Sequence, residues 1–98
     1  MFDLVNQIET IALAADKAIG STENTPVTEK EVIARLHSPR LGWAWEVYEA
    51  EIQGDDCLMF GTVLGWEKEM GYFTATDLKA AGAWLLWSLL DGETSLEA

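Results

Sequence analysis

The sequence contains one cysteine, Cys57, and one histidine, His37, and this scarcity excludes several kinds of site. A lone cysteine cannot form an internal disulfide, and with no recognisable signal peptide at the start it predicts a cytoplasmic protein in a reducing compartment. Zinc needs more ligands than these two side chains, and no nucleophilic triad can be assembled from them. Cys57 opens the apolar run CLMF, which predicts a buried thiol rather than a reactive one.

Basic residues are also scarce, because six lysines and arginines face 17 aspartates and glutamates and give a formal net charge of −11. Such a charge repels phosphate groups, so direct binding to nucleic acid is not expected. It favours a basic protein partner, which can itself be an effector that binds nucleic acid. No apolar run approaches the ~20 residues of a membrane-spanning helix, and the glycines form no phosphate-binding loop, so neither a membrane nor a cofactor is expected.

Apolar side chains, by contrast, are plentiful. Hydrophobic residues make up 49% of the 98 residues, which is enough to bury a core. The length fits one domain and leaves no room for a second core. The sequence therefore predicts a single compact acidic domain over residues 1–98.

Two helices are predicted in the N-terminal part of the chain. Apolar residues recur at three- and four-residue steps from Phe2 to Ile19, which predicts an amphipathic helix with Gly20 at its C-terminal cap. In the segment VTEKEVIARLHS, Thr28 and Glu31 have the spacing of a capping box, and an apolar stripe follows them. This segment therefore predicts a short second helix.

The apolar period changes to two after Gly42. An aromatic-rich alternation from Trp43 predicts a strand, QGDD at 53–56 predicts a turn, and CLMFGTVLG predicts a second strand. The run after Gly65 predicts a third strand, in which Gly71 leaves a gap for another backbone or a large ring. Together these segments predict an antiparallel meander.

A last helix is predicted after the meander, with Thr74 or Thr76 as its N-cap. Apolar residues from Leu78 to Leu90 surround nearly its whole circumference, which indicates deep burial or contact with another surface. The expected fold is therefore α+β: a three-stranded antiparallel meander flanked by two N-terminal helices and one C-terminal helix.

Seven acidic residues crowd the predicted meander, with Lys68 as the only base among them. They are Glu46, Glu49, Glu51, Asp55, Asp56, Glu67 and Glu69. Such a run is typical of the solvated side of a sheet, and it also fits an acidic patch that competes for a basic groove. The adjacent carboxylates in the turn suggest a metal site as a third interpretation, but the spaced ligands of a calcium loop are lacking.

Trp84 and Trp87 lie three positions apart in the predicted last helix. Tryptophan is enriched at the energetic centres of protein interfaces, so these two residues are candidate partner-binding residues, although a core position explains them equally well. The helix that carries them also suggests a homodimer.

Five short motifs follow one another between residues 43 and 78. They are Trp43-Ala44-Trp45, Gly54-Asp55-Asp56, Phe60-Gly61, Glu69-Met70-Gly71-Tyr72-Phe73 and Thr76-Asp77-Leu78. In this order they resemble the core of Domain of Unknown Function 2958, a family found in proteins of plasmids, phages and other mobile elements. The resemblance implies an origin in a mobile element, and it carries no activity that can be transferred.

These observations predict a small acidic protein-binding module of a mobile element, and not an enzyme. Its expected function is to inhibit a host nucleic-acid-targeting defence system, of the anti-CRISPR or anti-restriction type, by occupying a basic surface in the host cytosol. One alternative is a dimeric structural or regulatory protein without an anti-defence role. Another is a metal-dependent enzyme that uses the carboxylates.

Overall fold

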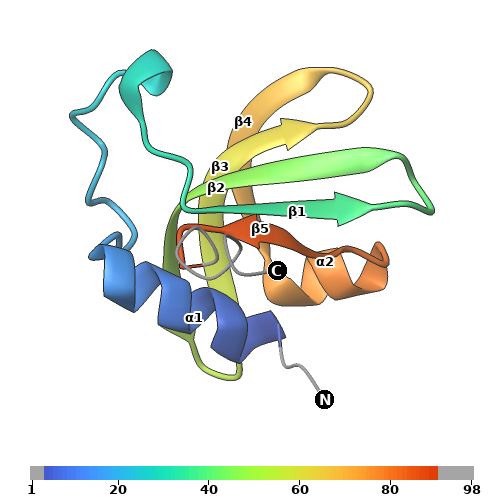
Figure 1. Ribbon diagram of the computed structural model, residues 1–98, viewed down its shortest axis with the longest axis horizontal. Coiled ribbons are helices and arrows are strands. Elements are labelled where there is room, and N and C mark those ends of the chain that lie inside the picture. The colour runs from blue at the N-terminus through green and yellow to red at the C-terminus, as the bar shows by residue number, and fades with distance from the viewer. Residues whose placement is uncertain (1–3, 91–98) are drawn as a thin grey trace.

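The computed structural model describes residues 4–90, and its elements follow one another in this order: α1 (Leu4–Ala15), the 3-10 turn η1 (Val27–Glu29), β1 (Ala34–Ser38), β2 (Trp43–Gln53), β3 (Asp56–Leu64), β4 (Lys68–Thr74), α2 (Ala75–Ala80) and β5 (Trp84–Ser88). The strands form one antiparallel sheet in the order β4-β3-β2-β1-β5 (Figure 1). The strand β1 therefore lies between β2 and β5.

The fold is α+β, but the predicted architecture is wrong. Over the described residues the sheet has five strands rather than three, and two α-helices replace the expected three. The strands β2, β3 and β4 lie where the meander was expected, so the errors concern the segments before and after it.

The predicted second helix does not form. Only η1 is helical there, and it begins after Pro26 without a side-chain cap, so the expected capping box of Thr28 and Glu31 is absent. From Ala34 the chain is extended and its burial alternates: Ala34, Leu36 and Ser38 are fully buried, whereas Arg35 and His37 are partly exposed. A short apolar stripe fits either period, and here pairing with β2 and β5 selects the strand.

The predicted C-terminal helix stops after α2. Thr74, one of the two candidate N-caps, caps this helix in a capping box with Asp77. Gly82, at φ 74°, then ends it: its N–H donates to the carbonyl of Lys79 at 3.0 Å, and the N–H of the next residue donates to the carbonyl of Leu78 at 2.9 Å. The apolar residues beyond Gly82 form β5. The segment that was predicted as one helix with apolar residues on all sides is therefore a short helix followed by a strand.

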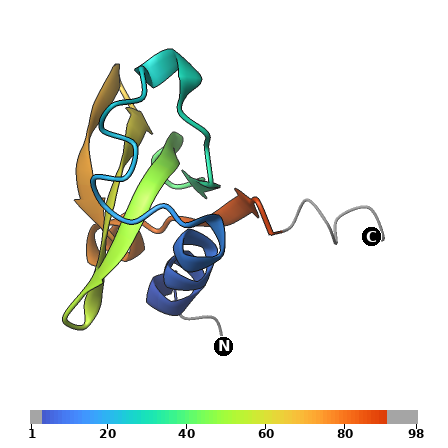
Figure 2. The ribbon, with the colours of Figure 1, turned by 90° about the vertical axis from the view of Figure 1, so that its left-hand side faces the viewer.

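The first helix also ends earlier than predicted, so Gly20 is not its cap. Asp16 has φ 58°, and its N–H donates to the carbonyl of Leu13 at 3.2 Å. The N–H of Lys17 donates to the carbonyl of Ala12 at 3.0 Å, which completes the usual pair of C-terminal bonds. The chain beyond Asp16 is therefore a loop, and Figure 2 shows it rising from the end of α1 to η1 beside the sheet.

Both helices pack against the same face of the sheet. Ile8 and Ile11 of α1 and Leu78 of α2 share one apolar core with buried residues of the strands, among them Leu36 and Met59. A β-bulge in β2 changes which residues face this core, because Val47 points inward before it and Ala50 points inward after it. Within residues 4–90, neither α-helix lies on the other face of the sheet, beside which the loop with η1 runs.

A close backbone approach occurs at Gly61, not at Gly71 where the sequence suggested one. A Cβ atom on Gly61 would lie 1.9 Å from the carbonyl oxygen of Glu46, whereas a Cβ atom on Gly71, its partner in β4, would have nothing within 4 Å.

We expect Gly61→Ala to lower the free energy of unfolding by about 2–3 kcal/mol or to prevent folding, as overpacking does. Gly71→Ala is the matched control and should change it by less than about 1 kcal/mol. Urea unfolding of both variants measures this, and equal effects would contradict the close approach.

Candidate protein-binding surface

The face of the sheet away from the helices is called the open face here. Its residues, taken from the strand register, are Trp84 and Trp87 of β5, Arg35 and His37 of β1, Ala44, Glu46, Tyr48 and Glu49 of β2, Phe60, Thr62 and Leu64 of β3, and Lys68, Met70 and Tyr72 of β4. Several of its large apolar side chains are exposed, which marks it as a candidate binding surface.

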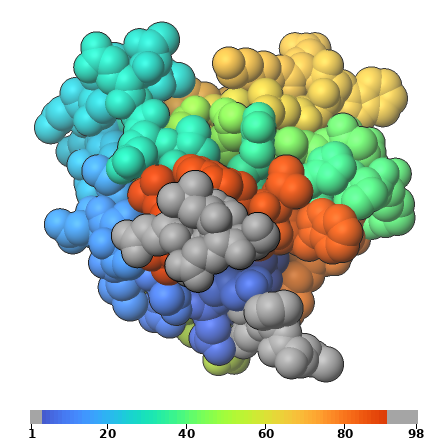
Figure 3. Space-filling view, viewed as in Figure 1, coloured from blue at the N-terminus to red at the C-terminus, as the bar shows by residue number. Residues whose placement is uncertain are grey.

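Trp84, Leu86 and Trp87 form one end of the open face, which we call the tryptophan end. Their exposed fractions are 59%, 58% and 38%. In the space-filling view the orange-red side chains of β5 reach the surface beside the teal residues of β1 (Figure 3). The strand register shifts here, and Leu86 is the extra residue that brings both tryptophans to the same face. The two predicted residues therefore lie together, although on a strand rather than on a helix.

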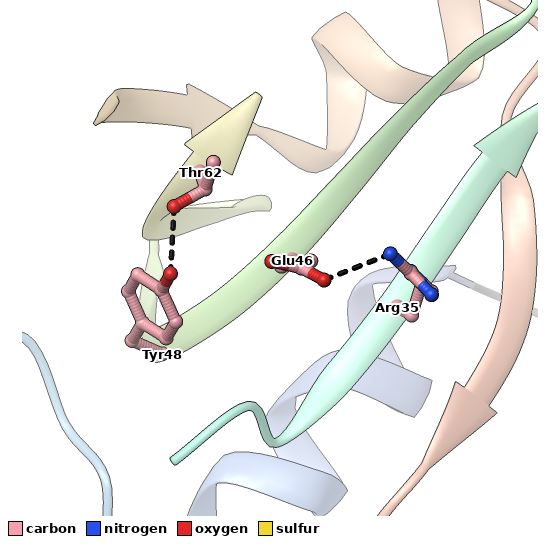
Figure 4. A network of polar contacts seen from close by, with 4 residues as sticks. All are labelled: Arg35, Glu46, Tyr48 and Thr62. Carbon is pink, nitrogen blue, oxygen red and sulfur yellow. Dashed lines mark hydrogen bonds and ion pairs between the residues drawn. The ribbon is translucent and has the colours of Figure 1, made fainter. Parts of the chain in front are cut away.

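A hollow of about 320 Å³ adjoins the tryptophan end, lined by Val32, Arg35, Glu46, Leu86 and Trp87. Arg35 and Glu46 form an ion pair across β1 and β2, with 2.8 Å between Nη2 and Oε2 (Figure 4). The Nε atom of Arg35 is buried and has no hydrogen-bond partner among residues 4–90. Glu46 is therefore neutralised by its neighbour, and the guanidinium group keeps an unused donor.

The middle of the open face is closed by a buried polar pair. The Tyr48 hydroxyl lies 2.6 Å from the Thr62 hydroxyl, and both side chains are buried (Figure 4). The Tyr48 ring also lies 6.5 Å from the ring of Phe60, between centroids. This pair separates the tryptophan end from a second hollow beside the loop 16–33.

Glu49 serves the protein's own structure, since it is only 3% exposed. Its carboxylate accepts hydrogen bonds from the N–H of Gly20 at 2.7 Å, from the N–H of Thr22 at 2.9 Å and from the Thr22 hydroxyl. Burial raises the pKa of Glu49, but these bonds and the Lys30 ammonium group outweigh it, so the pKa lies below its ordinary value. Glu49 thus fixes the loop to the sheet.

The other five predicted acids do not form one continuous patch. Glu51 and Asp55 are exposed near the turn between β2 and β3, whereas Glu67 and Glu69 are exposed near the turn between β3 and β4. Because β3 connects these turns, they lie about 30 Å apart. Asp56 is partly buried and accepts hydrogen bonds from the N–H groups of its neighbour at 2.8 Å and of Thr76 at 3.1 Å.

The hydrogen bonds to Asp56 have a local structural role. Interaction with the Thr76 side chain and the bond from the Cys57 N–H hold the pKa of Asp56 below its ordinary value. They connect the turn after β2 to the first turn of α2. The partner-binding role of the exposed acids, Glu51, Asp55, Glu67 and Glu69, stays a prediction.

The remaining chemical groups have structural roles in the described part of the chain. Burial raises the pKa of the Cys57 thiol to about 11, which disfavours the reactive thiolate. His37 donates from Nδ1 to the carbonyl of Trp43 at 3.1 Å. Between residues 4 and 90, no group of three or more histidine, cysteine, aspartate or glutamate side chains could hold a metal ion.

Sequence reasoning missed several residues of this surface. Arg35 and Leu86 line the hollow at the tryptophan end, and Phe60, Met70 and Tyr72 line the hollow beside the loop. The alternation of Met70 and Tyr72 in the third predicted strand was the available signal, because it put both side chains on one face. Arg35 and Leu86 gave no such signal, because they were assigned to helices.

The low pKa of Glu49 predicts acid-sensitive stability. The stabilisation should be fully present above the ordinary pKa of 4.5 and should be lost as the pH falls through the lower pKa of the folded state. Glu49→Gln should lower the free energy of unfolding by about 1–3 kcal/mol at neutral pH, because an amide cannot accept all three hydrogen bonds. It should also make the free energy of unfolding less dependent on pH in this acidic range. Urea unfolding from about pH 7 to about pH 3 tests this. Glu51→Gln, an exposed neighbour, is the control, and an unchanged profile for Glu49→Gln would contradict the assignment.

Comparisons with known proteins give no family to place beside this geometry. No protein-family model, no curated protein and no solved structure matches the chain. Among residues 4–90 no helix has the length and apolar character needed to cross a bilayer. The function must therefore be inferred from the surface itself.

Proposed function

We propose that the chain is a small protein-binding module that contacts its partner through the tryptophan end of the open face. The observation that carries this proposal is the exposure of Trp84, Leu86 and Trp87 beside a hollow that also contains Arg35. Tryptophan and arginine dominate the energetic centres of protein interfaces.

The distribution of charge supports a basic partner. Among residues 4–90, Glu46 is the only acid that lines the hollow beside the tryptophan end, and Arg35 pairs with it, although the whole chain carries a net charge of −11. The exposed acids of the meander lie instead at its two ends. An interface with few charges at its centre and charges at its rim is the common arrangement, and a rim of one sign accelerates encounter with a surface of the opposite sign.

In its concrete form, the partner is a nucleic-acid-targeting defence system of a host cell, and the module inhibits it by occupying its basic surface. Proteins that act on nucleic acid carry such surfaces, and an acidic module bound there would exclude the phosphate backbone. The resemblance to Domain of Unknown Function 2958 supports an origin in a mobile element. A mobile element would use an anti-CRISPR or anti-restriction protein against the defence system of its host.

Expression in bacteria that carry an active CRISPR or restriction system tests this function. The wild-type chain should raise phage plating or plasmid transformation, and Trp84→Ala with Trp87→Ala should lower that gain at least about tenfold, because the interface centre is removed. Trp66→Ala is the matched control, since Trp66 is 92% exposed in the turn between β3 and β4. A double variant as active as the wild type would refute the tryptophan end as the contact, and an inactive wild-type chain in every system would refute the inhibitor role.

The exposed acids need a separate test on a system that responds. Converting Glu51, Asp55, Glu67 and Glu69 to their amides should slow association about tenfold at low salt and reduce its salt dependence, while dissociation changes little. Surface plasmon resonance at two salt concentrations measures both rates. Unchanged association would refute electrostatic steering.

The charge balance of the tryptophan end also favours a second copy of the chain as its occupant, which is the dimeric alternative. Within residues 4–90, the one acid that lines the hollow at this end is Glu46, which Arg35 pairs, so two copies could meet there without bringing unpaired acids of that hollow together. Light scattering should then give a dimer mass for the wild type and a monomer mass for Trp84→Ala with Trp87→Ala. A wild-type monomer at about millimolar concentration would refute the dimer.

A further inference from the structure

A second hollow, which we call the loop groove, lies between the loop 16–33 and the strands β3 and β4. It has a volume of about 360 Å³, with Phe60, Met70 and Tyr72 on the sheet side and Glu23, Pro26 and Val27 on the loop side. The rings of Phe60 and Tyr72 lie 5.0 Å apart between centroids and are tilted by 50°. Tyr72, Val27 and Met70 are 63%, 46% and 39% exposed, so the edges of the groove are apolar and open.

The loop wall of this groove is held in place before any ligand binds. Glu49 accepts the three hydrogen bonds from Gly20 and Thr22 that fix the start of the loop. Lys30 donates to the carbonyl oxygen of Thr22 and, at 2.8 Å, to its hydroxyl, and its Nζ lies 5.9 Å from the centroid of the Phe60 ring. A groove with fixed walls loses little conformational entropy on binding, which is typical of ligand sites.

The same contacts determine which ligands fit. The carboxylate of Glu49 and the ammonium group of Lys30 are both engaged inside the protein, so the groove offers little to a carboxylate or phosphate ligand. Tyr72 is exposed at the edge of the groove, so its hydroxyl can donate to a ligand's carbonyl group. The Glu23 side chain is exposed at the rim and favours a basic group. An apolar ligand with free carbonyl groups and one positive charge meets all these conditions.

We propose that the loop groove binds an extended, proline-rich protein segment that carries a basic residue. Such a segment adopts the polyproline II conformation, whose backbone has no internal hydrogen bonds and presents its carbonyl groups. Proline rings pack on aromatic side chains, which Phe60 and Tyr72 provide. Glu23 pairs with the basic residue of the segment. This site lies across the Tyr48–Thr62 pair from the tryptophan end, so it does not depend on the function proposed above.

Titration of the isotope-labelled protein with a synthetic ten-residue peptide tests the proposal by NMR. The peptide consists of Pro-Pro-Ala repeats with one arginine near an end. We expect saturable shifts confined to residues 23–30 and to Phe60, Met70 and Tyr72. A peptide with every proline replaced by alanine should not saturate, because it loses both the preformed conformation and the rings. Absence of saturation at millimolar peptide, or equal binding of the alanine peptide, would overturn the proposal.

Two exposed side chains separate the aromatic and the electrostatic contributions without disturbing the core. Tyr72→Ala should raise the Kd of the peptide at least about tenfold, as the loss of an aromatic anchor does. Glu23→Gln should raise it about threefold at low salt and have no effect at high salt. Trp84→Ala is the control and should leave the Kd unchanged. Wild-type affinity for Tyr72→Ala would overturn the site, while the test of the tryptophan end would be unaffected.

Discussion

One extra residue in β2 is the feature on which the rest of the structure depends. The β-bulge between Val47 and Glu49 puts Tyr48 and Glu49 side by side on the open face, while the residues on either side of them, Val47 and Ala50, both enter the core. Without the bulge, side chains would alternate strictly between the two faces, and either Val47 or Ala50 would point away from the core. Because of it, Glu49 can hold the loop, and Tyr48 can bond to Thr62. The hollow beside the loop therefore follows from a local irregularity in a central strand.

The sequence predicted the parts of the fold whose signals are local. The strands β2, β3 and β4 span seven or more residues each, and the N-cap at Thr74, one of two candidates, depends only on residues next to it in the chain. The flanking strands could not be predicted in this way, because β1 and β5 are five residues each and β5 pairs with a strand far earlier in the chain. Five apolar-rich residues fit a helix as well as a strand, and only the distant partner decides between them.

The candidate site shows the same division between local and distant information. Neighbouring acids in the sequence suggested one patch, but an antiparallel pair carries the two turns of a meander to opposite ends of the sheet, so Asp55 and Glu67 are far apart. Trp84 and Trp87 were assigned to the wrong element, yet the shift at Leu86 still brings them together. Glu49 could not be distinguished from its exposed neighbours, because its hydrogen-bond donors come from a loop almost thirty positions earlier.

The position of β1 in the sheet has a consequence for the way the chain acquires its structure during synthesis. Ala34 pairs with Val47 on one side and with Ser88 on the other, so one edge of β1 stays unpaired until β5 has also left the ribosome. Contacts between such distant residues close slowly, because the intervening chain must first be ordered. The sheet should therefore be completed only after β5 has emerged, and the nascent meander must stay soluble until then.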